Sequence, residues 1–243
     1  MSLTADIRVL RQFLRGSGAG RDHAERLEQF YSLQAEDYDR FRERLLPGRR
    51  ELISGLPIQN GFRVIDFGGG TGANLEFLPE KAHAQLARWT IVDLSPSLLR
   101  VARQRANENA WSHVILCEDD ACRFQPEAPP DLVLFSYSLT MIPDWIGALD
   151  NAFNLLKPGG YIALVDFTVS RKFPPEEVVR HSSLTRMFWP LWFSWDNVFL
   201  NPDHLPYLLQ RFSTVRLEEH RTRLPYLPGS RVPYYLFVGQ KRV

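Results

Sequence analysis

The residues of this sequence that most clearly carry chemistry are an aspartate and four glycines. The segment RVIDFGGGTGANLEFL places Asp66 two residues before the run Gly68, Gly69 and Gly70, and Gly72 follows. An apolar, β-favouring run precedes the glycines, and a helix-like pattern follows them. A glycine turn between a strand and a helix lets backbone N–H groups approach a ligand, because no side chain stands in the way. The segment therefore predicts a nucleotide-binding loop.

The spacing of this loop fits more than one kind of site. Asp66, Gly68, Gly70 and Gly72 form an acidic-x-Gly-x-Gly-x-Gly pattern. The same letters fit G-x-G-x-x-A, ending at Ala73, which a dinucleotide-binding fold uses. A turn with only a structural purpose is a third interpretation. The loop by itself leaves these alternatives open.

A second acidic residue, Asp93, ends the apolar segment RWTIVDL. A carboxylate at the end of the second strand, about twenty positions past the glycine loop, accepts the ribose hydroxyls of an adenosine. The alternative role is a helix cap, but Ser95 and Pro96 already suit the cap and the first turn of the next helix. We therefore expect Asp93 and its neighbour Leu94 to bind the cofactor.

Polar and aromatic side chains also line a helix expected over residues 22–46. They form a stripe beside its apolar face. One interpretation is amphipathic packing with a polar margin, and the other is a lid whose polar groups point at a ligand. The stripe consists of Tyr31, Gln34, Tyr38 and Arg42.

The elements that must position these residues alternate between strand and helix. Such a chain folds into an α/β sheet that binds ligands at the carboxyl ends of its strands. One such end is the loop 136–141, which begins at Ser136. The expected strands are 64–67, 88–94, 113–121, 133–135, 161–167 and an antiparallel pair, 212–220 and 232–242, with helices over 96–106 and 143–156.

Composition narrows the classes of function. A net charge of +1 over 243 residues excludes a strong overall attraction to nucleic acid. No apolar run approaches 18 residues, and the first residues lack a signal-peptide core. The two cysteines fit a reducing compartment, and the six histidines show no metal-ligand spacing. We expect a cytoplasmic protein with no metal and no nucleic-acid partner.

The glycine loop resembles the first motif of class I S-adenosylmethionine methyltransferases. The turn Lys157-Pro158-Gly159-Gly160 before the strand 161–167 is a second likeness. This resemblance implies a Rossmann-like α/β fold with a seven-stranded, mostly parallel sheet and an antiparallel last strand. It also implies S-adenosylmethionine as cofactor, a helical lid over residues 1–55 and a methyltransferase domain over residues 56–243.

The same resemblance implies roles for individual residues. Asp66 would serve the amino-acid end of the cofactor, and Asp120-Ala121 would contact the adenine amino group. A solvated acidic turn is the alternative for Asp120. The expected cofactor-binding residues are Tyr31, Asp66, Gly68, Gly69, Gly70, Gly72, Asp93, Leu94, Asp120, Ala121 and Ser136.

Longer stretches resemble the N-methyltransferase of betaine-lipid synthesis, which acts on diacylglycerylhomoserine. They include FSYSLTMIPDW and DNVFLNPDHLPYL and lie within residues 30–235. The resemblance implies methylation of a lipid-borne homoserine amine, made by a separate aminocarboxypropyl transferase as partner. The alternatives are a phosphatidylethanolamine or quinone-type acceptor and, more distantly, a dinucleotide-dependent oxidoreductase or a non-catalytic nucleotide-binding module.

Methyl transfer to an amine requires orientation and a neutral nitrogen. The residues expected to orient the amine or accept its proton are Tyr38, Tyr137 and Asp144. A guanidinium suits the substrate carboxylate, and aromatic faces suit a methylated cation. The residues expected to bind substrate are Gln34, Arg42 and Trp195. A solvated helix charge for Arg42 and a core position for Trp195 are the alternatives.

The segment 170–200 is dense in Phe and Trp. Such a segment forms either core or an amphipathic surface for lipid. A lipid acceptor would require contact with a membrane, so we expect peripheral association with the inner face of the membrane.

Overall fold

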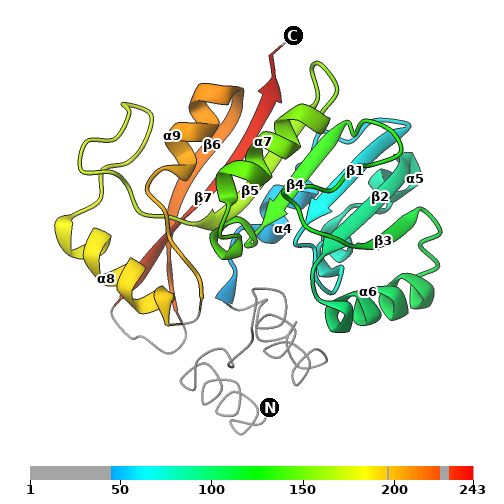
Figure 1. Ribbon diagram of the computed structural model, residues 1–243, viewed down its shortest axis with the longest axis horizontal. Coiled ribbons are helices and arrows are strands. Elements are labelled where there is room, and N and C mark those ends of the chain that lie inside the picture. The colour runs from blue at the N-terminus through cyan, green and yellow to red at the C-terminus, as the bar shows by residue number, and fades with distance from the viewer. Residues whose placement is uncertain (1–44, 196, 225–229, 243) are drawn as a thin grey trace, which may run out of the picture.

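A computed structural model describes residues 45–195, 197–224 and 230–242 (Figure 1). Within these residues seven strands form one sheet in the order β3-β2-β1-β4-β5-β7-β6. Neighbouring strands from β3 to β5 pair in parallel, and β7 pairs antiparallel with both β5 and β6. The predicted fold class, an α/β methyltransferase-like sheet with an antiparallel last strand, is confirmed.

The parallel half of the sheet consists of short strands. They are β1 (Phe62–Phe67), β2 (Leu86–Asp93), β3 (Val114–Glu118), β4 (Leu132–Ser136) and β5 (Tyr161–Phe167). β4 is buried along its whole length, as expected of a central parallel strand covered on both faces. The longer β6 (Phe212–Arg223) and β7 (Arg231–Lys241) complete the sheet.

Two hydrophobic cores lie on opposite faces of the sheet, because successive strand residues point to opposite sides. In β4, Leu132 and Leu134 belong to one core, whereas Val133 and Phe135 belong to the other. The first core lies under α4 (Arg49–Ser54), α5 (Glu80–Gln85), α6 (Pro96–Glu108) and α8 (Ser183–Ser194). The second lies under α7 (Trp145–Leu155) and α9 (His204–Arg211).

Helix α4 belongs to the packed sheet domain. Its residues Leu52 and Ile53 are fully buried in the first core. The helical lid expected over residues 1–55 falls mostly on residues 1–44, outside the described part of the chain, and the proposed domain boundary stays a prediction. Among the described residues, no helix is long and apolar enough to span a bilayer.

Candidate functional site

The glycine loop leaves β1 at the point where the sheet order reverses between β1 and β4. Ligands of open α/β sheets bind at such a reversal, outside the carboxyl ends of the strands. Gly68, Gly70 and Gly72 all have positive φ, at 68°, 55° and 71°. This conformation is easy for glycine and strained for other residues. The predicted glycine turn is therefore present where a ligand is expected.

Packing also requires glycine in this loop. A Cβ added at Gly68 would lie 2.4 Å from the Ser138 Cβ. The Ser138 hydroxyl donates a 2.7 Å hydrogen bond to the Phe67 carbonyl, which fixes the loop after β4 against the end of β1. The glycines therefore allow two loops to touch, in addition to any approach of a ligand.

The element after the loop differs from the expected helix. A five-residue 3-10 helix, η1 (Ala73–Phe77), follows Gly72, and the short α5 begins only after Pro79. Proline disfavours helical geometry at the residue before it, so Leu78 is extended and separates the two pieces. The free N–H groups of a long helix, which the sequence suggested, are replaced by those of the loop and of one short turn.

Asp93 fastens the glycine loop to α6. Its Oδ2 accepts a hydrogen bond from the Gly70 backbone N–H at 2.9 Å, and its Oδ1 accepts one from the Ser95 N–H at 2.9 Å. Ser95 is the N-cap of α6, as predicted, since its hydroxyl accepts from the Leu98 N–H at 3.3 Å. The bond to Ser95 gives Asp93 a structural role at the start of α6, close to the helix-cap alternative, whereas the sequence did not reveal the bond to the glycine loop. Ribose binding by Asp93 stays a prediction.

Asp66 lies at the centre of a buried polar cluster. Its two carboxylate oxygens accept from the Asn74 side-chain amide at 3.2 and 2.9 Å. Asn74 accepts in turn from the Arg49 guanidinium, with Nη2 to Oδ1 at 2.8 Å. Burial raises the pKa of Asp66 to about 6, against the opposing effects of the Asn74 hydrogen bond and the Arg49 charge.

Arg49 and Asn74 were not predicted as site residues. Both are buried, and they join the start of α4 to the η1 helix that follows the glycine loop. The sequence signal for Asn74 was weak, because it is one of two polar residues, with Glu76, in the run ANLEFL after Gly72. Arg105 was missed as well. It donates to the Thr71 carbonyl and pairs with Glu76 at 2.7 Å, so α6 also holds the loop.

The end of β3 carries the predicted pair Asp120 and Ala121 in a tight turn. Asp120 Oδ1 accepts from the Cys122 N–H at 2.9 Å, and the Ala121 carbonyl accepts from the Asn151 side chain at 2.8 Å. Helix α7 therefore positions this turn. These hydrogen bonds fix the conformation of the acidic turn. Recognition of the adenine amino group by Asp120 and Ala121 stays a prediction.

Ser136 ends β4 with a buried hydroxyl that has no hydrogen-bond partner within the described chain. A buried hydroxyl without a partner is costly, and ligands satisfy many such groups. Asp66, Asp93 and Ser136 lie in the last two residues of β1, β2 and β4, and Asp120 follows β3. All four therefore lie at the carboxyl edge of the sheet, on adjacent strands. The structure thus gathers the described members of the predicted cofactor set along that edge.

Tyr137 has a positive φ of 55° and is buried. Its hydroxyl donates to the Pro47 carbonyl at 2.7 Å. Burial and the neighbouring Asp166 raise the pKa of Tyr137 well above its ordinary value. A phenol that keeps its proton at neutral pH is a poor base, so this environment favours an orienting role.

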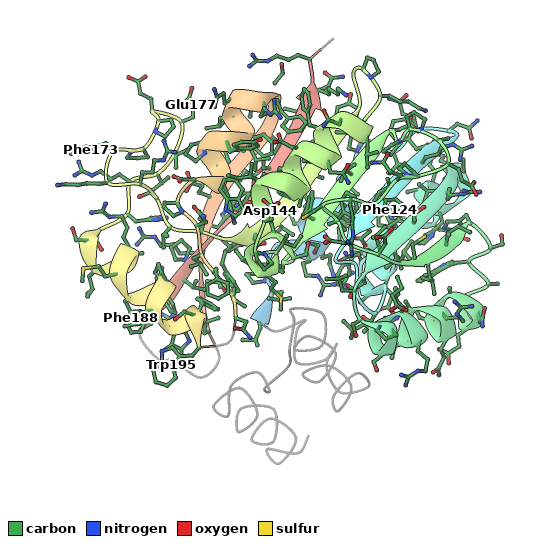
Figure 2. All side chains as sticks on the ribbon, viewed as in Figure 1. Phe124, Asp144, Phe173, Glu177, Phe188 and Trp195 are labelled. Atoms are coloured by element: carbon green, nitrogen blue, oxygen red, sulfur yellow. The ribbon has the colours of Figure 1, made fainter. Side chains whose placement is uncertain are left out.

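Asp144 caps α7. Its Oδ1 accepts from the Gly147 N–H at 2.9 Å, and the residue is exposed (Figure 2).

Trp195 lies at the end of α8 and is 70% exposed, so the core alternative for this side chain is wrong. Four predicted residues, Tyr31, Gln34, Tyr38 and Arg42, lie outside the described residues. Across the described ranges, no group of three or more His, Cys, Asp or Glu side chains is placed to hold a metal ion.

Asp166 near the end of β5 is another buried carboxylate that the sequence did not single out. It accepts from the Thr140 hydroxyl at 2.8 Å and from the Thr140 and Phe167 N–H groups at 3.1 and 2.8 Å. These bonds fix η2 (Leu139–Met141), the turn that follows β4. The loop after β4 is therefore held from both sides, by β1 and by β5.

Comparison of the sequence with known proteins shows similarity to methyltransferases. A family model described as "Methyltransferase domain" matches residues 33–221. The chain is 30% identical over 148 residues to the ubiquinone/menaquinone biosynthesis C-methyltransferase UbiE of Bartonella tribocorum, covering 57% of this chain and 56% of that protein. It is 33% identical over 143 residues to the aklanonic acid methyltransferase DauC of a Streptomyces species, covering 58% and 64%. The match thus spans little more than half the length of these relatives.

Solved structures share the fold. Phosphoethanolamine N-methyltransferase 2 of Haemonchus contortus, in complex with phosphomonomethylethanolamine and S-adenosylhomocysteine, aligns with a TM-score of 0.69 at 17% identity, covering 92% of this chain and 61% of that one. The [4+2]-cyclase SpnF aligns with a TM-score of 0.68 at 16% identity, covering 94% and 99%. A cyclase and a methyltransferase on one fold illustrate that the fold does not decide the reaction.

Proposed function

Because this chain belongs to the methyltransferase domain family, we propose that it transfers methyl groups from S-adenosylmethionine to an amine on a lipid headgroup, with diacylglycerylhomoserine as acceptor. The observation that carries the proposal is the tie between the glycine loop and Asp93 at the point where the sheet order reverses. Family membership weighs against the dinucleotide-dependent oxidoreductase considered from the loop alone.

The residues at this edge fit a cofactor that carries adenosine. The glycine loop has backbone without side chains, partly exposed at Gly68 and Gly69, and Ser136 offers a buried hydroxyl. A carboxylate accepts up to about four hydrogen bonds, so the two backbone bonds to Asp93 are compatible with further donors such as ribose hydroxyls. The bound cofactor supplies an activated sulfonium methyl group, which an uncharged amine attacks in line.

The chain's own contribution is to orient the reactants and to exclude water. Orientation is worth up to about 7–11 kcal/mol in favourable cases. The loop after β4 is suited to orienting the reactants because Ser138 and Thr140 fix it to β1 and β5. Tyr137 adds rigidity, because its hydroxyl donates to the Pro47 carbonyl and its buried ring packs against Phe167.

Two features support a lipid acceptor. The first is the resemblance of FSYSLTMIPDW and DNVFLNPDHLPYL to the betaine-lipid enzyme. The second is helix α8, which carries exposed aromatic side chains and whose buried Phe193 contacts Phe167 at the end of β5. If the acceptor is diacylglycerylhomoserine, a separate aminocarboxypropyl transferase is the partner that must produce it.

A quinone-type acceptor is the second candidate, because the UbiE relative is named as a C-methyltransferase of ubiquinone and menaquinone biosynthesis. Carbon methylation needs a ring activated by a phenolate, whereas amine methylation needs only a neutral nitrogen. Radiolabelled S-adenosylmethionine incubated with the full chain and each acceptor separates the two. The acceptors are diacylglycerylhomoserine, phosphatidylethanolamine and a demethylated menaquinone.

We expect label in the betaine lipid, and no label when the Gly70→Arg variant is used, because an arginine side chain would fill the space next to the loop backbone. Label in the menaquinone alone would transfer the proposal to the quinone acceptor. No label in any lipid, from a chain that binds S-adenosylhomocysteine, would overturn the lipid acceptor.

A further inference from the structure

Helix α8 carries apolar side chains on two sides. Trp189 and Phe193 are buried in the first core. A surface helix ordinarily presents polar residues on its outer side. In α8 and at its end that side is apolar instead, with exposed Leu184, Met187, Phe188, Leu191, Trp192 and Trp195.

These exposed side chains form one continuous surface, which we call the outer face of α8. Their spacing of three and four residues places them along the same side of the helix. Phe188 stacks on Trp192, with ring centroids 5.9 Å apart and an interplanar angle of 25°. Figure 2 shows Phe188 and Trp195 on the side of α8 that is turned away from the sheet. Contiguous exposed apolar surface of this kind marks an interaction site.

Two basic residues lie around Phe173 in the segment that leads into α8. Phe173, in the segment before α8, is exposed, and its ring lies 5.4 Å from Lys172 Nζ and 5.5 Å from Arg180 Cζ. Neither cation has a carboxylate within ion-pair distance among the described residues. The same segment also carries the exposed Glu177 (Figure 2). The surface thus combines aromatic rings with positive charge.

A chain of ring contacts connects the outer face to the candidate site. Phe188 contacts Trp189 at 5.0 Å between centroids, and Trp189 contacts Phe193 at 5.8 Å. Phe193 contacts Phe167 at the end of β5 at 4.7 Å, and Phe167 contacts Tyr137 after β4 at 4.8 Å. The buried side of α8 is therefore packed onto the end of the sheet that carries the site, and the outer face lies on the opposite side of the same helix.

We propose that the outer face of α8, together with Phe173, Lys172 and Arg180, docks on the interface of an anionic lipid bilayer. Trp and Phe rings settle at the boundary between headgroups and acyl chains, and the basic residues add attraction to anionic lipids. Docking in this way would hold the carboxyl edge of the sheet beside the headgroups. The inference rests on the proposed lipid acceptor and deepens it, because it explains how the acceptor reaches the site.

The test measures vesicle binding separately from methylation. The full chain is sedimented with vesicles of phosphatidylcholine alone, or of phosphatidylcholine with phosphatidylglycerol. We expect binding to the anionic vesicles, at least tenfold stronger than to the neutral ones, and loss of that preference at high salt.

One variant removes the apolar contacts at positions where the fold does not use them. Leu184, Met187 and Leu191 are 77%, 73% and 67% exposed, so replacing all three by Gln should leave folding intact. We expect this variant to lose at least tenfold in vesicle binding. The matched control replaces the exposed Ile115, Ile146 and Val215, which lie on β3, α7 and β6, by Gln. The control should bind vesicles as the unchanged chain does.

A second variant addresses charge. Lys172→Glu with Arg180→Glu should abolish the preference for anionic vesicles, whereas Lys81→Glu with Arg103→Glu, near the other edge of the sheet, should not. Equal binding by the Leu184/Met187/Leu191 variant and its control would overturn the proposal. A dimer in analytical ultracentrifugation that this variant dissociates, without vesicle binding by the unchanged chain, would assign the face to a second copy and overturn it too.

The same variants distinguish this proposal from the proposed function. If both hold, the α8 variant loses methylation of vesicle-borne lipid and keeps methylation of the same lipid in detergent micelles. Vesicle binding without methylation of any amine lipid would leave docking supported and the acceptor wrong. Full methylation of vesicle-borne lipid by the α8 variant would overturn the docking proposal and leave the proposed acceptor unaffected.

Discussion

The Asp93 carboxylate accepts a 2.9 Å hydrogen bond from the backbone N–H of Gly70, so the second acidic strand end holds the glycine loop in shape. The other oxygen of Asp93 accepts from Ser95 at the start of α6. One side chain thus fixes two backbone segments that border the candidate cofactor site. This finding changes what a substitution at Asp93 is expected to do.

Asp93→Asn should weaken S-adenosylhomocysteine binding by about 10-fold or more. Hydrogen bonds to a charged group are worth roughly 1.5–3 kcal/mol, and about 1.4 kcal/mol corresponds to one decade of affinity. The amide would also turn an NH₂ group toward one of the two backbone donors, so thermal stability should fall. Titration calorimetry measures the affinity, with Glu108→Gln on the exposed end of α6 as control. An unchanged dissociation constant would remove Asp93 from the cofactor site.

Gly68→Ala should destabilise the fold more than Gly61→Ala. Both glycines have positive φ, at 68° and 81°, and this conformation costs an ordinary residue roughly 1–2 kcal/mol. A Cβ at Gly61 meets nothing within 4 Å, whereas one at Gly68 meets Ser138 at 2.4 Å. The difference between the two free energies of unfolding in urea therefore isolates the steric clash. Adding Ser138→Gly to Gly68→Ala should recover part of the loss, and an additive double variant would disprove the contact.

The buried Asp66 predicts a pH dependence of stability. Its pKa is raised from 3.8 to about 6 in the folded chain, so between these values the folded state binds more protons than the unfolded state. The contribution of Asp66 to the free energy of unfolding therefore decreases as pH rises through this window, by about 3 kcal/mol in total at about 1.4 kcal/mol per unit.

The Asp66→Asn variant should lack the part of the pH dependence of the free energy of unfolding that Asp66 contributes. Urea unfolding of the two proteins at half-unit steps from pH 4 to pH 7 gives the comparison. The stability of the unchanged chain relative to the variant should be greatest near pH 4 and smallest near pH 7. Parallel curves would mean that the folded-state pKa of Asp66 is ordinary.

Asp144→Ala should lower stability and leave methyl transfer almost unchanged. The loss of an N-cap costs about 1 kcal/mol, and Gly147 would lose its acceptor. Asp144→Ser should restore the cap and the stability. A positioned general base contributes about 10²–10⁴-fold in rate, so a fall in kcat of that size in both variants would instead assign Asp144 to proton transfer.

Local patterns predicted the sheet well. The strand 161–167 was predicted with the ends that β5 has, and the cap Ser95 with Pro96 marks the start of α6. Continuous apolar runs and alternation are properties of neighbouring residues, so the sequence displays them directly. The edge of the sheet where the acidic residues gather followed from the order of strands and helices.

What the sequence did not predict depends on partners far along the chain. Arg49 and Asn74 are 25 positions apart, Ser138 and Phe67 are 71 apart, and each pair meets only in the folded sheet. The segment 170–200 illustrates a second difficulty. Its aromatic residues divide between core and surface within one helix, with Phe193 buried beside the exposed Trp192, and composition cannot separate such neighbours.

The way the glycine loop is held bears on the order in which the chain folds. Its shape depends on Asp93 from β2, on Ser138 after β4 and on the Asn74–Arg49 link to α4. Contacts between distant parts of a chain form late, because closing long loops costs entropy before the contacts compensate for it. The loop therefore reaches its final conformation only when β1, β2 and β4 have paired, and a nascent chain that has emerged only through β1 carries the glycines without the site.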